Sequence, residues 1–169
     1  MRKIFLKSAI IFSLFLLNGC EYTGVEKSVS SRSENLNELG VYSGFSPVEI
    51  NILPLTKINI GNKNSEVICV YISMADRFGS QIKAPAIFRF ELYEKISRSG
   101  EVKGRRVFIW PDIDLQNPGD NNCHWEDFLR AYKFDLACDV QKNRHYVFQV
   151  TCLCPSGRRL ASEITLSAQ

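Results

Sequence analysis

The sequence contains few of the residues on which most catalytic and metal sites depend. Its 169 residues include two histidines, two tryptophans and two methionines, and no pair of cysteines has the Cys-x-x-Cys spacing of zinc sites. Neither His124 nor His145 is accompanied by a nucleophile motif, which argues against a Ser-His-Asp or Cys-His triad. Internal repeats and low-complexity tracts are also missing. The sequence therefore predicts a non-enzymatic protein without a cofactor.

The longest apolar run is too short to cross a membrane. It extends from Ala9 to Leu17 and is followed by Asn18, whereas a spanning helix needs about 20 apolar residues in succession. Three basic residues, the last of them Lys7, precede the run, and small or turn-forming residues follow it. This order is typical of a secretory signal peptide, which we expect to occupy residues 1–19.

The tetrad Leu17-Asn18-Gly19-Cys20 resembles the lipobox of bacterial lipoproteins, in which an apolar, a variable and a small residue precede the cysteine that becomes the mature first residue. Asn18 departs from the commoner Ala or Ser at the variable position. The resemblance implies that Cys20 carries lipid and holds the protein on a membrane. By the sorting rule of enteric lipoproteins, Glu21 in place of aspartate implies the outer membrane. The alternative is an ordinary secretion signal followed by an unrelated cysteine.

Without the signal peptide the chain is electrically balanced. Three of the 21 basic residues and none of the 18 acidic residues lie in residues 1–19, so that 18 of each sign remain. Such a chain lacks the basic excess typical of nucleic-acid-binding proteins, and we expect no nucleic-acid partner. Residues 20–46 are rich in Ser, Asn, Glu and Gly without an apolar period, which predicts a flexible tether about 30 Å long after the lipidated cysteine. We expect residues 47–169 to form one domain.

Beyond residue 47, apolar and polar residues alternate with the two-residue period of β-strands. Phe88 and Phe90, for example, alternate with Arg89 and Glu91, so Phe90 is expected in the core. Strand-like segments span residues 48–60, 66–74, 86–94, 106–110, 132–140, 145–154 and 158–167. About seven strands favour an all-β antiparallel β-sandwich, immunoglobulin-like or C2-like, with a small barrel as the alternative. One short helix is expected within residues 123–132, and a hairpin at residues 141–144.

Five cysteines follow Cys20, namely Cys69, Cys123, Cys138, Cys152 and Cys154. An exported protein meets an oxidising compartment, and the odd number leaves at least one thiol unpaired. Cys138 and Cys152 share the inferred inward face of neighbouring strands and form the predicted disulfide. A simple hairpin would set Cys138 opposite Tyr146, so this disulfide requires strands that cross between sheets. Burial of both cysteines as small apolar side chains is the alternative.

A zinc site is a second hypothesis for the cysteines, with Cys152, Cys154, Cys123 and His124 as its ligands. Side chains two apart on an extended strand lie roughly 6.5 Å apart, too far for two thiolates on one zinc. Pro155 would permit the bend that brings them together. Without a Cys-x-x-Cys pair, the zinc site is the weaker hypothesis.

The segment WPDIDLQNPGDNN places Asp112, Asp114 and Asp120 among Asn and Gly residues. Calcium prefers such oxygen ligands, which makes these aspartates a candidate calcium site. Asp76 is a further candidate ligand by analogy with C2 domains, whose aspartates come from adjacent loops. Asn117, however, stands where the twelve-residue calcium loop requires glycine. A turn in which Asp and Asn bond their own backbone is the favoured interpretation.

Residues 70–94, VYISMADRFGSQIKAPAIFRFELYE, and residues 104–115, GRRVFIWPDIDL, resemble small lipoproteins of the planctomycete kind. The resemblance covers most of the mature domain and implies a lipid-anchored sandwich, without an activity or site residues. We therefore expect a non-enzymatic, lipid-anchored domain of the bacterial cell envelope that binds or assembles with an envelope protein partner. A calcium- or carbohydrate-binding module is the second hypothesis, and an envelope hydrolase is the third.

Overall fold

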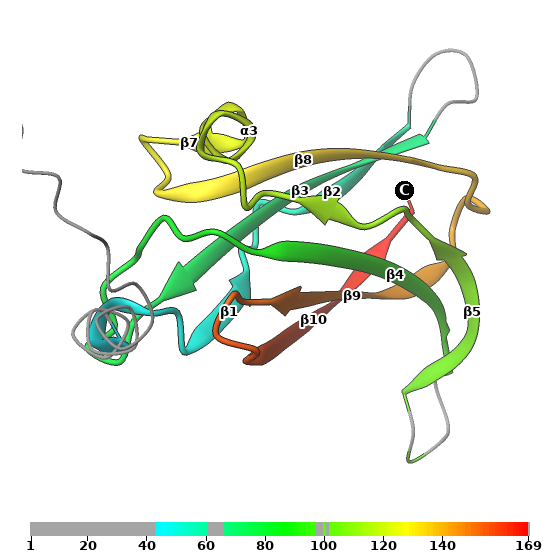
Figure 1. Cartoon of the computed structure of the whole chain (residues 1–169). Coiled ribbons are helices and arrows are strands. Elements are labelled where there is room, and N and C mark those ends of the chain that lie inside the picture. The colour runs from blue at the N-terminus through cyan, green and yellow to red at the C-terminus, as the bar shows by residue number, and fades with distance from the viewer. Residues whose placement is uncertain (1–42, 61–65, 97–99, 101, 169) are drawn as a thin grey trace, which may run out of the picture. The chain divides into compact units, whose positions relative to one another are not determined.

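A computed structural model describes residues 43–60, 66–96, 100 and 102–168 (Figure 1). The predicted signal peptide, Cys20 and all but the end of the predicted tether lie outside the described residues. The elements are η1 (Ser43–Phe45), β1 (Glu49–Ile52), β2 (Lys57–Ile60), β3 (Glu66–Ala75), β4 (Ile87–Lys95), β5 (Lys103–Ile109), β6 (Ile113–Asp114), α3 (Pro118–Cys123), β7 (Trp125–Glu126), β8 (Ala131–Cys138), β9 (His145–Leu153) and β10 (Arg159–Ser167). No helix within these ranges has the length and apolar character that a bilayer crossing requires.

The strands form two antiparallel sheets that pack face to face. In sheet A the order is β1-β3-β8-β7, and β2 also pairs with β3. In sheet B the order is β10-β9-β4-β5, and β6 also pairs with β4. Figure 1 shows β3 and β8 of sheet A above β4 and β9 of sheet B. The predicted all-β antiparallel sandwich is confirmed.

The order of the strands is that of an immunoglobulin-like sandwich. The pairing of β3 with β8, and of β9 with both β4 and β10, corresponds to the B–E and C–F–G pairings of that fold. The hydroxyl of Tyr146, near the start of β9, accepts a hydrogen bond from the backbone N–H of Gln141 at 2.9 Å. This contact is the tyrosine corner that marks the start of strand F in immunoglobulin-like domains.

The connection from β8 to β9 crosses from sheet A to sheet B, so the hairpin expected at residues 141–144 is wrong. Each strand has an apolar face and pairs with a more distant strand, β8 with β3 and β9 with β4. Because the two apolar faces point at each other across the sandwich, the strands lie in opposite layers rather than side by side.

Aromatic side chains from both sheets fill the core. Phe88 and Phe90 project from β4, and Phe134 projects from β8; all three are at most 2% exposed. The ring centroids of Phe90 and Phe134 lie 4.9 Å apart, and those of Phe88 and Phe134 lie 5.3 Å apart. Phe148 of β9 stacks on Phe90 within sheet B. The core position expected for Phe90 is therefore confirmed.

The short helix α3 lies earlier than the sequence predicts. Asn117 caps it, because its Oδ1 accepts a hydrogen bond from the backbone N–H of Gly119 at 2.8 Å, and Pro118 occupies the first turn. The expectation of a helix within 123–132 is wrong for most of that segment. Instead, β7 pairs with β8 in sheet A, with Trp125 opposite Tyr132. Tyr132 is already part of the inward alternation of β8, so this end of the segment is strand.

Candidate functional site

The structure does not gather the predicted calcium ligands. Arg89 binds both carboxylate oxygens of Asp112, through Nε at 2.8 Å and Nη2 at 2.7 Å. Asp114 accepts a hydrogen bond from the backbone N–H of Gln116 at 2.9 Å, and Asp120 is exposed on α3. Nowhere in the described ranges do three His, Cys, Asp or Glu side chains come close enough to hold a metal. The candidate calcium site is therefore wrong, because Arg89 and a local turn engage two of its carboxylates.

Asp76, the expected partner from another loop, is committed to its own turn. Its Oδ1 accepts hydrogen bonds from the backbone N–H of Phe78 at 2.8 Å and of Ser80 at 3.0 Å. The carboxylate is buried, and Gly79 completes the turn with a φ of +79°. Asp76 thus stabilises the β3–β4 connection.

The predicted disulfide between Cys138 and Cys152 is also wrong, since both thiols are free. Cys138 lies opposite Glu66 in sheet A, whereas Cys152 lies opposite Phe88 and Leu160 in sheet B. The strands do lie in different sheets as the pair requires, but Cys152 is seven residues beyond the start of β9. That separation corresponds to about 23 Å along the strand.

Cys152 and Cys154 come closer together than an extended strand allows. Their Sγ atoms are 3.9 Å apart, because the chain leaves β9 after Leu153 and turns, with a hydrogen bond from Cys154 N to Arg158 O at 2.9 Å. Both thiols are buried, and this burial raises their pKa. The other two ligands of the zinc hypothesis do not join them, since Cys123 is exposed on α3 and His124 stacks on Phe134. The pair therefore packs as small apolar side chains.

The outer face of sheet B carries a row of ion pairs. Arg106 donates to Oε1 of Glu91 at 2.8 Å, and Lys103 Nζ lies 2.8 Å from Oε2 of Glu163. The bond to Glu163 raises the pKa of Lys103. The pair of Arg89 with Asp112 continues the row toward the start of β4. These contacts join β4, β5 and β10 across the surface of the sheet.

A shallow pocket of about 260 Å³ lies at the end of this row, lined by Ile87, Arg89, Asp112, Thr151, Leu153 and Arg159. Thr151 is buried, and its Oγ1 has no hydrogen-bond partner within the described part of the chain. A buried polar group without a partner costs about 1–3 kcal/mol of stability, but this oxygen is closed to solvent and so to a ligand in the pocket. Leu153 is 46% exposed beside it. Arg159 is exposed, and among the residues that the structure describes it has no ion-pair partner.

The chemistry of this pocket suits a carboxylate attached to an apolar group. The exposed Arg159 guanidinium is a hydrogen-bond donor, and a carboxylate accepts such bonds more strongly than a neutral oxygen does. Leu153 and Ile87 supply apolar contact around this guanidinium. We name the outward-facing side chains of sheet B, from Lys103 to this pocket, the ion-pair face.

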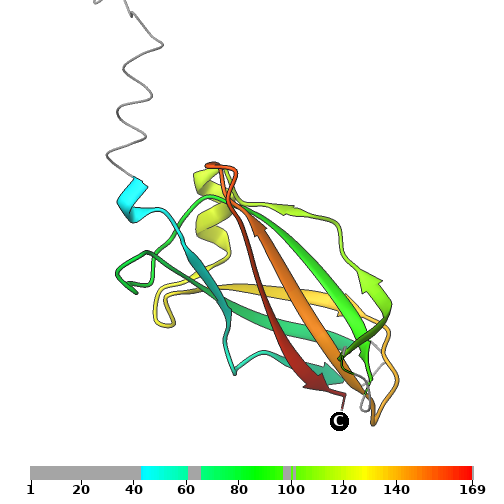
Figure 2. The ribbon, with the colours of Figure 1, turned by 90° about the horizontal axis from the view of Figure 1, so that it is seen from below.

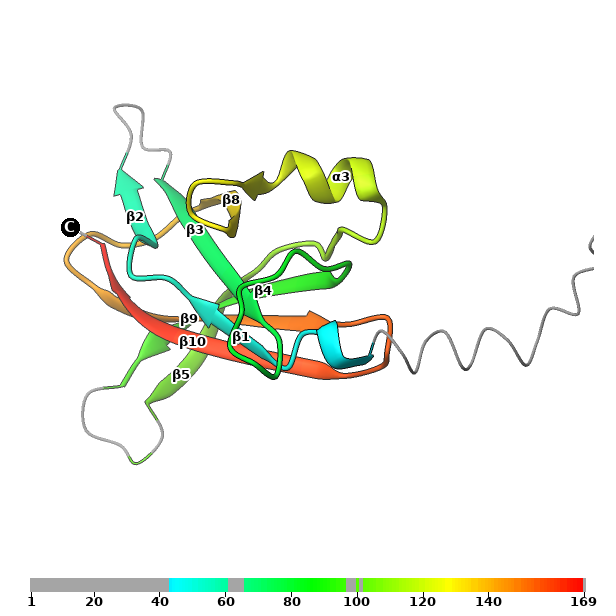
Figure 3. The same cartoon turned by 90° about the vertical axis from the view of Figure 1, so that its left-hand side faces the viewer.

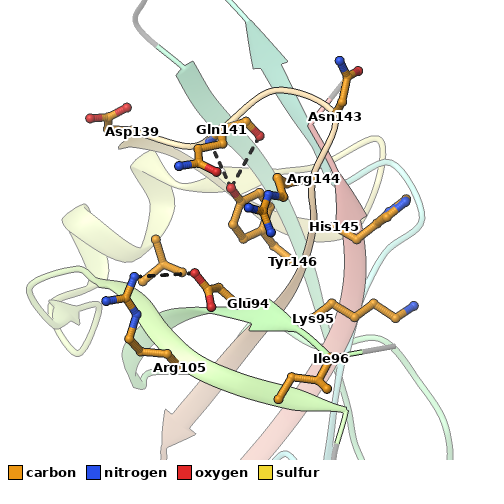
Figure 4. Close-up of a pocket in the computed structure, with 11 residues that line it drawn as sticks. Glu94, Lys95, Ile96, Arg105, Asp139, Gln141, Asn143, Arg144, His145 and Tyr146 are labelled. Carbon is orange, nitrogen blue, oxygen red and sulfur yellow. Dashed lines mark hydrogen bonds and ion pairs between the residues drawn. The ribbon is translucent and has the colours of Figure 1, made fainter. Parts of the chain in front are cut away.

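A larger cleft of about 410 Å³ lies at the other end of sheet B, between the β4–β5 strands and the β8–β9 connection (Figure 4). In it Arg105 pairs with Glu94 at 3.5 Å. Figure 4 shows Asp139 and His145 pointing away from each other on opposite sides of Tyr146. The residues that line the cleft include no serine, threonine or cysteine. The cleft is lined instead by two carboxylates, of Glu94 and Asp139, and that of Glu94 is paired with Arg105.

Comparisons of the chain with protein-family models, with curated proteins and with solved structures found no match.

Sequence reasoning missed both the pocket at Thr151 and the ion-pair face. The alternation in β9 gives a signal for the outward direction of Thr151, but nothing in it shows that the hydroxyl is buried. Lys103 and Glu163 are far apart in the sequence and lie on opposite edge strands of sheet B, β5 and β10. The long Lys103 side chain reaches across the face of the sheet, where it also donates to Gln149 of β9. Contacts of this kind follow from strand order, which periodicity does not specify.

Proposed function

We propose that this protein is a lipid-anchored component of the bacterial cell envelope, held on the outer membrane through Cys20, and that it acts as a non-enzymatic binding module. Its partner is another envelope protein, which docks on the ion-pair face and places an acidic side chain in the pocket. The observation that carries this proposal is the pocket in which exposed Leu153 lies beside exposed Arg159, which has no ion-pair partner among the described residues.

The surface around the pocket favours a protein partner over a small ligand. The pocket is shallow, and the ion pairs beside it lie on four hydrogen-bonded strands that present a broad surface. Protein interfaces typically combine a small apolar centre with a polar rim. Leu153 supplies such a centre, and the charged side chains supply the rim.

Chemical crosslinking in living cells tests the binding face. Wild-type protein, Leu153→Asp and Arg159→Glu are each crosslinked, purified and compared for captured envelope proteins. Arg105→Glu is the matched control, because it reverses an exposed charge in the distant cleft. We expect a protein captured by the wild type and the control but lost from both pocket variants. If all four proteins capture the same partners, the ion-pair face is not the binding site.

Mass spectrometry of the mature first residue tests the anchor. We expect the N-terminal peptide to begin at Cys20 and to carry thioether-linked diacylglycerol, because two acyl chains are what stable anchoring requires. Cys20→Ser should no longer be processed at that bond or carry the lipid. A Cys20→Ser protein that is processed normally and stays on the membrane after a high-salt wash contradicts the anchor.

A further inference from the structure

The three most exposed large apolar side chains among the described residues are all phenylalanines. Phe128 is 96% exposed, and Phe45 and Phe78 are each 66% exposed; the next, Leu55, is 51% exposed. Burial of a phenylalanine side chain is strongly stabilising, so exposure to this extent forgoes that stabilisation. Exposed apolar groups that lie near one another mark sites of interaction with proteins or membranes.

The three phenylalanines lie on segments at one end of the sandwich. Phe45 ends η1, Phe78 lies in the β3–β4 connection and Phe128 lies between β7 and β8. Figures 1 and 2 place these three segments along the left-hand edge of the domain, and Figure 3 shows the domain from that side. A hydrogen bond from Arg130 Nη2 to Gln81 O at 2.7 Å joins two of the segments. We name this end the phenylalanine end.

Both loop phenylalanines are held outward by defined turns. The turn around Phe78 is fixed by the buried Asp76 carboxylate and by a hydrogen bond from Asp76 N to Ser80 O at 3.1 Å. The turn around Phe128 closes with Arg130 N donating to Asp127 O at 3.3 Å, and Arg130 has a left-handed φ of 49°. A non-glycine residue in that region is uncommon and costs conformational energy.

Two arginines lie close in the chain to Phe78 and Phe128. Arg77 is exposed, and its guanidinium carbon lies 4.8 Å from the ring centroid of Phe78. Arg130 follows Phe128 by two residues. The neighbouring carboxylates are Asp76, which is buried in its turn, and Glu126 and Asp127, which are exposed. A guanidinium beside an aromatic ring can bind a lipid phosphate while the ring enters the interface.

We propose that the phenylalanine end lies against the bilayer, with the rings of Phe45, Phe78 and Phe128 among the lipid headgroups. The proposal rests on the proposed anchor at Cys20. The chain enters the described domain at Ser43, in η1, which belongs to this end. A flexible coil with the length of residues 21–42, which is 22 residues, would span about 25 Å, and the proposed anchor would then keep this end close to the lipid. At such proximity, even a weak tendency of the rings to insert into the membrane populates the inserted state.

This orientation has a consequence for the two surface sites. The cleft around Tyr146 lies at the other end of sheet B and faces away from the lipid. The pocket at Thr151 lies on the outer face of sheet B near the end of β9, toward the phenylalanine end (Figure 1). A partner that is itself held in the membrane can therefore reach the pocket laterally.

Site-specific photo-crosslinking in living cells tests the orientation. The photoreactive amino acid p-benzoylphenylalanine is placed at position 45, 78 or 128 of the full-length protein, where it replaces phenylalanine conservatively. Position 108 is the matched control, because Phe108 is a partly exposed phenylalanine of β5, away from the phenylalanine end. After irradiation, mass spectrometry identifies what is attached to each position and measures the lipid on the N-terminal peptide.

We expect lipid adducts at positions 78 and 128, and at 45 in lower yield, and none at position 108. A protein adduct at 78 or 128 overturns the proposal and makes this end a protein-binding surface. If the N-terminus carries lipid but the three positions carry no lipid adduct, the orientation is wrong while the anchor stands. If the N-terminus carries no lipid, the proposed anchor is wrong. Lipid adducts at the three phenylalanine positions would then show that the domain contacts the membrane without an anchor. If those adducts are also absent, both proposals are overturned.

Discussion

The inner face of sheet B is a cluster of aromatic rings, whereas its outer face is a row of ion pairs. Along β4 the inward side chains Phe88 and Phe90 are fully buried, and the outward Arg89 between them is exposed. Burial of a phenylalanine in a packed core contributes several kcal/mol, while an exposed ion pair typically contributes less than about 1 kcal/mol. One strand thus supplies stability on one side and a polar surface on the other.

This difference between the two faces shows which side chains of sheet B can be substituted without loss of the fold. A substitution on the inner face changes packing with the opposite sheet, because Phe90 contacts Phe134 across the sandwich. A substitution on the ion-pair face changes contacts that add little to folding. A binding surface can therefore change there without loss of the fold, and four substitutions measure the contrast.

The largest effect is expected from Phe90→Ala. The substitution leaves a cavity among Phe88, Phe134 and Phe148 and should lower the free energy of unfolding by about 3–5 kcal/mol. Phe128→Ala makes the same chemical change at a side chain that is 96% exposed, and it should leave stability unchanged. Urea denaturation monitored by circular dichroism measures both. Equal effects of the two substitutions would falsify the assignment of the inner face.

A smaller loss is expected from Tyr132→Phe, which removes a buried hydroxyl from the core. The hydroxyl lies 2.9 Å from both the N–H and the C=O of Ala84, and 3.1 Å from Oδ1 of Asn121. Its removal leaves buried polar groups without a partner, so the free energy of unfolding should fall by about 1–3 kcal/mol. Tyr71→Phe, at a half-buried position on the other face of sheet A, is the control and should cost less. A loss as small as the control's would show that the network around Asn121 is dispensable.

The two faces also differ in how far the sequence predicts them. Alternation identifies the buried side chains of β4, β8 and β9 correctly, because a two-residue period requires that one face be apolar. It does not specify strand order, and so the β8–β9 hairpin, the disulfide of Cys138 with Cys152 and the calcium site were wrong. Each of these depends on which distant segment lies beside a residue; for Asp112 that neighbour is Arg89.

A still smaller effect is expected from Tyr146→Phe, at the tyrosine corner. The substitution removes the hydrogen bond to Gln141 N, which lies at the partly exposed crossing between the sheets. Because water can replace the lost partner there, the free energy of unfolding should fall by about 0.5–1.5 kcal/mol. Thermal unfolding measures the change. A loss as large as that of Tyr132→Phe would mean that the crossing contributes as much to stability as the core network does.

The smallest effect is expected from Asp112→Asn on the ion-pair face. The hydrogen bond from Arg89 lowers the pKa of Asp112 below its ordinary value of 3.8. Because the pKa is lower in the folded state, the ion pair stabilises the fold above the unfolded pKa, and that contribution is lost as the pH falls through the folded pKa. The Arg89 and Asp112 side chains are 49% and 40% exposed, and solvent screens their attraction.

At pH 7 and low salt, Asp112→Asn should therefore lower Tm by about 2 °C or less. The difference from the wild type should persist down to about pH 5, vanish well below pH 4 and shrink at high salt. Thermal unfolding at several pH values measures it. A difference that grows as the pH falls would contradict the ion pair, since it would require a carboxyl group that is stabilised in its protonated form.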